Sequence, residues 1–188
     1  MTTIIGIAGR ARAGKDTIAE HLQQVHGFCR RAFADALKKA AEDIFGLSHE
    51  QLYGREKETV DGFWGRSPRE MLQLLGTECL RQGYGQDVWV RALQRFIHVR
   101  RAVRDWVVPD VRFVNEAEAI RAWGGRLWLV RRPGLEAMGI VGHASEHDLD
   151  AFGAWDHVFE NVGTPDDLCT LVDGVLLLGG GHAQKDND

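Results

Sequence analysis

Short apolar runs alternate with segments of helical periodicity along this chain of 188 residues. The first run, residues 4–8, is uniformly apolar, as is typical of a strand buried on both faces. A glycine-containing loop follows at residues 9–14, and residues 16–25 then show helical spacing. The inner face of that helix is predicted to carry Ile18, Leu22 and Val25. Strand, glycine loop and helix in this order predict an α/β protein with a parallel sheet flanked by helices.

The rest of the chain repeats this alternation. Further strands are predicted at residues 28–34, 106–109, 126–130 and 158–160. Further helices are predicted at residues 35–45, from residue 67 onward, and at 86–104, 116–123 and 165–178. The helix that starts at Ser67 has Pro68 at its first position and Glu70 placed to complete a capping box. Residues 49–65 and 131–152 are predicted to be irregular, and residues 179–188 to form a disordered tail.

Composition narrows the classes of protein that fit this pattern. With 44% hydrophobic residues the chain can bury one core, so residues 1–178 are expected to form a single domain. The formal charge of −4 lacks the basic excess typical of proteins that bind polymeric nucleic acid. The three cysteines are widely spaced, which argues against a zinc site or a disulfide framework. Because no apolar stretch reaches the length of a membrane span, we expect a cytoplasmic protein with no membrane partner.

The most informative motif is GRARAGKDT at residues 9–17, which matches G-x-x-x-x-G-K between a strand and a helix. Glycines at such a place let the backbone wrap around phosphate oxygens, and the N–H groups of the helix start point at the anion. Lys15 is expected to reach the outer phosphates as a mobile positive charge. The motif therefore predicts a phosphate loop with these candidate residues: Gly9, Ala13, Gly14, Lys15, Asp16 and Thr17.

One position of this loop departs from the usual pattern. Asp16 stands where a serine or threonine normally contacts Mg²⁺. A carboxylate is also a good ligand for a hard cation, directly or through water. Asp16 is therefore a candidate metal ligand, and Thr17 is a candidate hydroxyl donor to a phosphate.

A polar stripe runs along the helix that starts at Ser67. Its members are spaced four residues apart, so they share one side of the helix: Arg69, Gln73, Thr77 and Arg81. Apolar residues occupy the opposite side, which can pack on a core. The stripe is either the solvated face of an ordinary amphipathic helix or a surface that meets an anionic substrate.

A second group of charged residues follows the apolar run at residues 107–109. Asp110 and Arg112 stand at the end of this predicted strand, and ligands of open parallel sheets gather at the carboxyl ends of strands. Asp110 is a candidate carboxylate for Mg²⁺, and Arg112 is a candidate for an anionic acceptor. The alternative is a local salt bridge at the end of a strand.

Positive charge on the acceptor side favours a phosphate acceptor. A phosphate monoester has a second pKa near 6, so it is mostly ionised at neutral pH and needs no strong general base. Its transfer reaction brings two anions together, and cations are needed to offset their repulsion.

These motifs together resemble the deoxynucleoside monophosphate kinases of tailed phages. Besides the phosphate loop, the resemblance rests on an ordered series: FADALK at 33–38, LYG at 52–54, WGRSPREMLQLLGTECLR at 64–81, VVPDVRFVNEAEAIRAWGG at 107–125, RRPG at 131–134, HASE at 143–146 and ENVGTPDDL at 160–168. The resemblance implies a P-loop kinase of the adenylate-kinase type that uses Mg²⁺ and ATP to phosphorylate a deoxynucleoside monophosphate. It also implies a helical acceptor-binding region at about residues 46–105, a small lid at about 131–152, and a homodimer.

The resemblance assigns expected roles to individual residues. The catalytic set that it implies is Lys15, Arg81, Asp110, Arg112 and Arg132, and Asn161 is expected near the donor adenine. The substrate-binding set that it implies is Asp35, Lys38, Trp64, Arg69, Gln73, Arg81, Trp89, Arg112 and Glu116. The metal ligands that it implies are Asp16 and Asp110.

Two other hypotheses fit the phosphate loop. One is a small-molecule kinase with a different phosphorylated acceptor, of the dephospho-coenzyme A or phosphomevalonate type. The other is a regulator that binds ATP without transferring phosphate. Such a regulator would lack an acceptor site, so the Arg69 and Arg81 stripe and the pair Asp110 and Arg112 argue against it.

Overall fold

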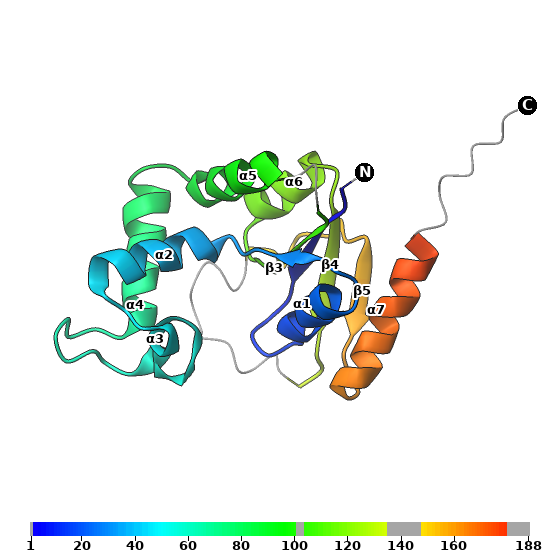
Figure 1. Ribbon diagram of the computed structural model, residues 1–188, viewed down its shortest axis with the longest axis horizontal. Coiled ribbons are helices and arrows are strands. Elements are labelled where there is room, and N and C mark those ends of the chain that lie inside the picture. The colour runs from blue at the N-terminus through cyan, green and yellow to red at the C-terminus, as the bar shows by residue number, and fades with distance from the viewer. Residues whose placement is uncertain (1, 101–103, 135–147, 180–188) are drawn as a thin grey trace, which may run out of the picture. The chain divides into compact units, whose positions relative to one another are not determined.

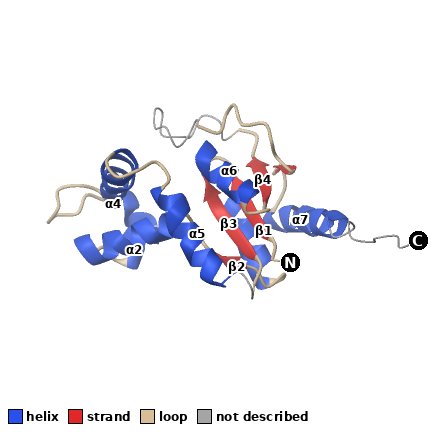
Figure 2. Cartoon of the chain, turned by 90° about the horizontal axis from the view of Figure 1, so that it is seen from above, coloured by secondary structure: helices blue, strands red, loops and turns tan. Residues whose placement is uncertain are grey.

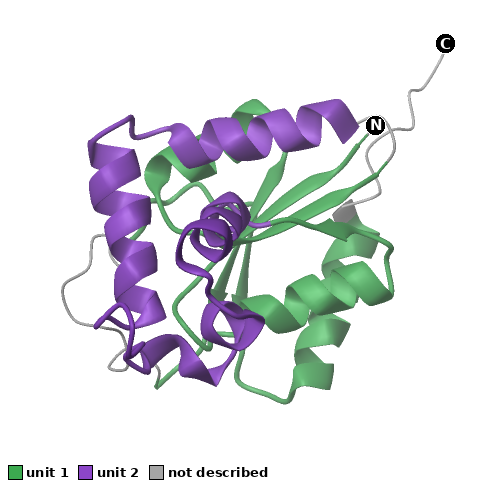
Figure 3. Cartoon of the chain, turned by 60° about the vertical axis from the view of Figure 1, so that its left-hand side comes forward, with its two compact units in different colours: residues 1–31, 101–188 green, residues 32–100 purple. Residues whose placement is uncertain are grey.

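The computed structural model describes residues 2–100, 104–134 and 148–179. They form two compact units: residues 1–31 with 101–188, and residues 32–100, coloured separately in Figure 3. No helix within the described ranges has the length and apolar character needed to cross a bilayer.

Unit 1 contains a five-stranded sheet in which every strand pairs in parallel with its neighbours (Figures 1 and 2). The strands are β1 (Ile4–Ala8), β2 (Cys29–Arg30), β3 (Trp106–Val111), β4 (Arg126–Arg131) and β5 (His157–Glu160). Their order across the sheet is β2-β3-β1-β4-β5. The phosphate-loop strand β1 is therefore central, because β3 and β4 pair with its two edges. This arrangement confirms the predicted α/β class.

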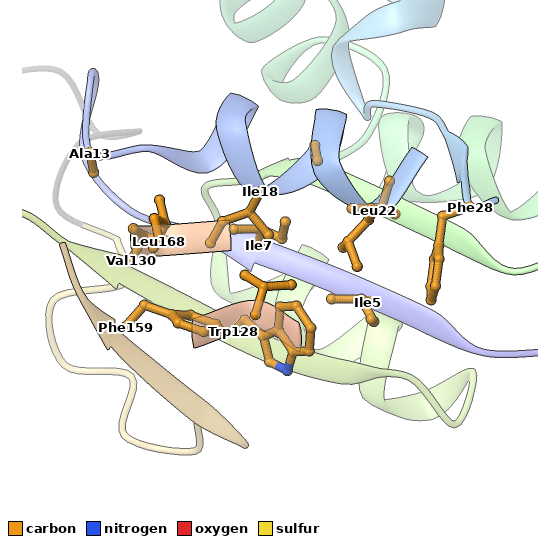
Figure 4. Packing of buried hydrophobic residues seen from close by; sticks show 13 residues of the cluster. Ile5, Ile7, Ala13, Ile18, Leu22, Phe28, Trp128, Val130, Phe159 and Leu168 are labelled. Carbon is orange, nitrogen blue, oxygen red and sulfur yellow. The ribbon is translucent and has the colours of Figure 1, made fainter. Parts of the chain in front are cut away.

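Helices cover both faces of this sheet. Helices α1 (Lys15–Gln24) and α7 (Pro165–Gly179) pack on one face and on each other, and α6 (Val114–Ala122) packs on the other. Figure 4 shows Ile18 and Leu22 of α1 directed at Ile5 and Ile7 of β1. Burying each such aliphatic side chain is worth about 1.5–3 kcal/mol. Val25, by contrast, is exposed because α1 ends at Gln24, so its predicted inward orientation is wrong.

Strand β3 contains an irregularity next to the candidate residues Asp110 and Arg112. Its register with β1 shifts between the pairs Gly6–Val108 and Ala8–Val111. Pro109 lies within this shift, where the missing N–H costs little because β2 pairs only with Trp106 and Val107. Such bulges redirect the side chains that follow them.

Unit 2 is helical. Its elements are α2 (Ala34–Phe45), α3 (His49–Tyr53), the 3-10 helix η1 (Arg55–Glu58), α4 (Pro68–Gln73), the π-helix η2 (Leu74–Gln82) and α5 (Val88–Arg100). Its own buried cluster contains Ala41, Leu47, Leu52 and Met71. The helical region was predicted at about residues 46–105, whereas the compact unit runs from residue 32 to residue 100.

Several predicted boundaries need correction. Strand β2 covers two residues of the predicted 28–34, because only Cys29 and Arg30 pair with β3, and helix α2 already begins at Ala34. The predicted loop at residues 49–65 contains α3, which starts with a capping box between Ser48 and Gln51. The signal for this helix was visible as serine followed three residues later by glutamine. The predicted capping box of Ser67 and Glu70 is confirmed.

Candidate active site

The phosphate loop is shaped by glycines that touch the neighbouring strand and helix. Gly9 has φ 144°, and a Cβ atom there would lie 2.4 Å from the carbonyl oxygen of Val130. Gly14 has φ 114°, and its Cβ would lie 2.7 Å from Asn161 Nδ2 and 2.8 Å from Leu168 Cδ2. Both glycines are therefore required by the packing of the loop as well as by its left-handed backbone.

Charged side chains of the loop point to different neighbours. Lys15 Nζ donates a 2.7 Å hydrogen bond to the carbonyl oxygen of Arg10, which closes the loop on itself. Asp16 is exposed and forms an ion pair with Arg30. Arg12 adopts φ 63°, an uncommon conformation for a residue with a side chain. Such strained residues cluster at binding sites.

Asn161 holds the loop from the side of β5. Its side-chain Nδ2 donates a 2.8 Å bond to the carbonyl oxygen of Ala13, and only 6% of the residue is exposed. Its backbone N–H donates to the carbonyl oxygen of Arg131 at 2.7 Å. Asn161 thus links the phosphate loop to the end of β4.

Two pockets of unit 1 meet at the loop. The first has a volume of about 180 Å³ and is lined by Arg12, Gly14, Lys15, Asp16, Thr17, Arg132, Asn161, Gly163, Pro165 and Leu168. The second has a volume of about 370 Å³ and lies at the carboxyl ends of β1, β3 and β4. Its polar lining includes Arg10, Lys15, Arg112, Arg131, Arg132 and Asp150. Lys15 and Arg132 line both pockets.

The end of β3 contributes unequally to the second pocket. Val111 and Arg112 line it, whereas Asp110 is half-buried in the strand and is among the lining residues of neither pocket. Glu116 is buried, and its carboxylate accepts the backbone N–H groups of Arg112 at 2.9 Å and Phe113 at 3.3 Å. The Glu116 carboxylate therefore fixes the backbone that carries Arg112.

Some candidate residues of unit 2 are exposed or half-buried. Arg69 forms an ion pair with Glu58, and the ammonium group of Lys38 lies 3.8 Å from the centre of the Tyr53 ring. Asp35 accepts the backbone N–H of Ala32 at 2.9 Å, at the start of α2. Gln73 is half-buried at the end of α4.

Two other candidates of unit 2 are buried. Arg81 is 5% exposed and donates to the carbonyl oxygen of Gln86 at 3.1 Å. Trp89 is 8% exposed, and its indole N–H donates to the carbonyl oxygen of Gly76 at 3.1 Å. Gly76 belongs to the π-helix η2, whose wider hydrogen-bonding pattern turns the chain less per residue than an α-helix does. The predicted stripe therefore does not continue with α-helical drift beyond Gln73.

Trp64 is held by a turn. The Asp61 carboxylate accepts the backbone N–H groups of Phe63 and Trp64, and these bonds keep the pKa of Asp61 below its ordinary value. The indole N–H of Trp64 donates to the carbonyl oxygen of Phe45 at 2.9 Å. Because this N–H is engaged, the exposed part of the ring offers a substrate mainly an apolar surface.

Sequence reasoning missed several residues of the second pocket. Arg10 belongs to the quoted loop motif but was not selected, although it lines the pocket and forms a 3.5 Å ion pair with Asp150. Asp150, Phe152 and Trp155 come from a stretch without periodicity, so no sequence signal placed them there. Most of the predicted lid, residues 135–147, and residues 180–188 of the predicted tail lie outside the described residues.

Comparison with known proteins agrees with this geometry. Solved structures similar to this chain include a dephospho-CoA kinase from Campylobacter jejuni, with TM-score 0.52, 14% identity and coverage of 94% of this chain and 97% of that one. They also include a sugar kinase from Janibacter sp. HTCC2649, with TM-score 0.53, 15% identity and coverage of 98% of this chain and 100% of that one. At these identities the likeness establishes the P-loop kinase fold.

Sequence relatives are more specific. A putative deoxynucleotide monophosphate kinase of Acanthamoeba polyphaga mimivirus is 37% identical over 84% of this chain and 88% of that protein. The deoxynucleoside-5'-monophosphate kinase of Escherichia phage T5 is 40% identical over 40% of this chain and 30% of that protein. The family model for deoxynucleotide monophosphate kinase matches residues 57–172, which is more than half of the chain. The chain therefore belongs to the deoxynucleotide monophosphate kinase family, a family of ATP-dependent phosphotransferases.

Proposed function

We propose that phosphate passes from ATP to a deoxynucleoside monophosphate where the two pockets of unit 1 meet. The observation that carries this proposal is that Lys15 and Arg132 line both pockets. A phosphoryl group in transit has to remain next to positive charge from its departure to its arrival. Two cations shared by adjoining pockets meet this requirement.

The first pocket suits the donor. It contains the start of α1, where backbone N–H groups and the helix dipole favour phosphate. Beyond the loop, its lining includes the amide of Asn161 and the apolar side chains of Pro165 and Leu168. In this proposal Asn161 positions the loop through Ala13 and also borders the nucleoside.

The second pocket suits the phosphate of the acceptor. Five cationic side chains line it, against one carboxylate, that of Asp150. No general base is needed, because the acceptor phosphate is mostly ionised at neutral pH. Arg112 and Arg132 are proposed to hold its oxygens, since guanidinium groups bind such oxygens in pairs.

The side chains at the phosphate loop could also act as ligands of Mg²⁺. Asp16 and Thr17 line the first pocket, and a carboxylate and a hydroxyl are oxygen ligands of the kind that Mg²⁺ takes together with substrate phosphates. We propose that these two residues hold the ion and that Arg30 orients the Asp16 carboxylate through their ion pair. When bound, Mg²⁺ neutralises developing charge on the phosphates. A metal role of Asp110 has less support, because this residue borders neither pocket.

The predicted roles of Lys38, Arg69, Gln73 and Trp64 toward the nucleoside of the acceptor stay predictions. Their side chains are at least partly exposed in unit 2, which leaves surface for a substrate. A homodimer likewise remains a proposal, which sedimentation of the purified chain would test.

The test is a coupled assay of ADP release with Mg·ATP and each deoxynucleoside monophosphate, applied to Lys15→Met. The matched control is Lys39→Met, because Lys39 is an exposed lysine of α2 paired with Glu42 and Asp43. We expect Lys15→Met to lower kcat by about 10²–10³-fold and Lys39→Met to leave it unchanged. Near-normal turnover in a folded Lys15→Met protein would refute the proposed site. Transfer to another phosphorylated acceptor, but to no nucleotide, would refute the proposed substrate while retaining the site.

A further inference from the structure

Three potential ligand side chains meet near the C-terminal end of α1, beside α7. His21 Nε2 lies 2.6 Å from Asp173 Oδ1, and His26 Nε2 lies 2.7 Å from the same oxygen. The two imidazole rings are 5.3 Å apart and meet edge to face. Among the described residues this is the group of three whose donor atoms all lie within 4.8 Å of one another.

The packing of the two helices brings these side chains together. His21 precedes Leu22 on α1, and Asp173 follows Val172 on α7; Leu22 and Val172 are both fully buried in the same core. His21 and Asp173 therefore stand at the rim of one buried seam. His26 is placed by the turn that ends α1, where its backbone N–H donates to the carbonyl oxygen of Leu22 at 3.2 Å. Side chains anchored in this way lose little further freedom when they bind a ligand.

We propose that His21, His26 and Asp173 form a binding site for a transition-metal dication of the zinc class. Two imidazole nitrogens and one carboxylate oxygen are ligands that such ions prefer, and they leave a further coordination position for water. Bonds of about 2.0–2.2 Å to one ion keep ligand atoms roughly 3–3.5 Å apart. The two histidine–aspartate separations of 2.6 Å and 2.7 Å need to lengthen only slightly to admit the ion, and the third pair, the two imidazole nitrogens, lies within 4.8 Å.

The chemistry of the cluster separates it from the proposed Mg²⁺ site. Mg²⁺ prefers oxygen ligands and phosphates, and this cluster supplies one oxygen against two nitrogens. His21 also lies six residues along α1 from Lys15, about 9 Å along the helix axis. Cys169, one turn before Asp173, is not part of the group whose donor atoms lie within 4.8 Å of one another.

The test uses the full chain without a histidine tag, treated with chelator and free of nucleotide. ZnCl₂ is titrated by calorimetry, thermal unfolding is followed with and without Zn²⁺, and CoCl₂ is added to record visible absorption. We expect one ion per chain, a higher Tm with Zn²⁺, and a Co²⁺ spectrum typical of nitrogen and oxygen ligands. His26→Gln and Asp173→Asn should each weaken binding at least about tenfold.

Matched controls are His49→Gln, a histidine stacked on Tyr53 in unit 2, and Asp166→Asn, an exposed carboxylate on α7. Both should bind Zn²⁺ as the parent chain does. Absence of heat and of a Tm shift in the parent chain would show that the cluster is only a hydrogen-bonded histidine–carboxylate group. Binding that survives in both His26→Gln and Asp173→Asn would place the ion elsewhere. Either result would overturn the proposal, and neither depends on kinase activity.

Discussion

Cationic side chains are used differently in the two units. In unit 1, Lys15, Arg112 and Arg132 line a pocket of about 370 Å³ at the carboxyl edge of the sheet. In unit 2, Arg81 is buried and donates to a backbone carbonyl group, and Arg69 is paired with Glu58. The difference shows that arginines picked out by sequence motifs can either line a pocket or form contacts within a helical unit. Substitutions in each unit can distinguish a role in catalysis from a role in stability.

The largest expected difference in catalysis is between two adjacent arginines of unit 1. Arg132 lines both pockets, whereas Arg131 lines one and is paired with Glu160 at 3.6 Å. We expect Arg132→Ala to lower kcat by about 10²-fold, the usual loss for one group that stabilises transition-state charge. Arg131→Ala should lower it by less than Arg132→Ala does. Steady-state kinetics of both variants would check this, and equal losses would contradict a special position for Arg132.

Two glycines offer the next comparison, between the backbones of the two units. Gly14→Ala combines a left-handed backbone with contacts of 2.7 Å and 2.8 Å, so it should cost about 1–3 kcal/mol of unfolding free energy and also disturb the phosphate loop. Gly76→Ala brings a Cβ within 2.6 Å of Leu37 Cδ2, which is the end of a flexible side chain and can move. Alanine also has a higher helix propensity than glycine, which offsets part of the cost. Gly76→Ala should therefore cost less. Denaturant unfolding of both variants measures the difference, and a larger cost at Gly76 would show that the helical unit is the more tightly packed.

Trp89 tests whether a buried candidate of unit 2 touches substrate. Trp89→Phe removes the indole donor to the carbonyl oxygen of Gly76, which should cost about 1–2 kcal/mol of stability. KM for the deoxynucleotide should stay unchanged, because Trp89 is buried in unit 2 and lines neither pocket. The matched variant in unit 1 is Trp155→Phe, at a tryptophan that lines the second pocket. It should lower stability less than Trp89→Phe does. A raised KM with unaltered stability in Trp89→Phe would assign this residue to the substrate instead.

The smallest expected effect concerns the cap of α4. Ser67→Ala removes the hydroxyl that accepts the backbone N–H of Glu70, at a cost of about 1 kcal/mol. Hydrogen bonds from the Ser67 backbone and hydroxyl lower the pKa of Glu70 below its ordinary value of 4.5. This contribution to stability is therefore present above pH 4.5 and is lost as the pH falls through the folded-state pKa.

Melting curves of the parent chain and Ser67→Ala at pH 7 and in acid would check both parts. The difference in Tm between the two proteins should become smaller as the pH falls through the folded-state pKa of Glu70. Ser48→Ala, at the cap of the five-residue α3, is a control for a shorter helix. A difference in Tm that grows in acid would contradict the stabilising role of the ionised Glu70 carboxylate.

The sequence by itself determined the α/β class, the strand before the phosphate loop and most helix positions. These features depend on local patterns: the uniformly apolar run of β1, the spacing of Ile18 and Leu22, and the capping residues Ser67 and Glu70. The phosphate loop was also predictable, because its glycines, lysine and position between strand and helix follow one after another in the chain.

Only the tertiary structure decided how the candidate residues are used. Pairing of β4 with β1 brings Arg132 toward Lys15, and the seam between α1 and α7 brings Asp173 to His21 and His26; these partners are more than a hundred residues apart in the chain. The switch from α4 to the π-helix η2 and the burial of Arg81 and Trp89 depend on packing within unit 2. Periodicity reports which side of an element a residue occupies, whereas burial and hydrogen-bond partners depend on what the rest of the chain places against that side.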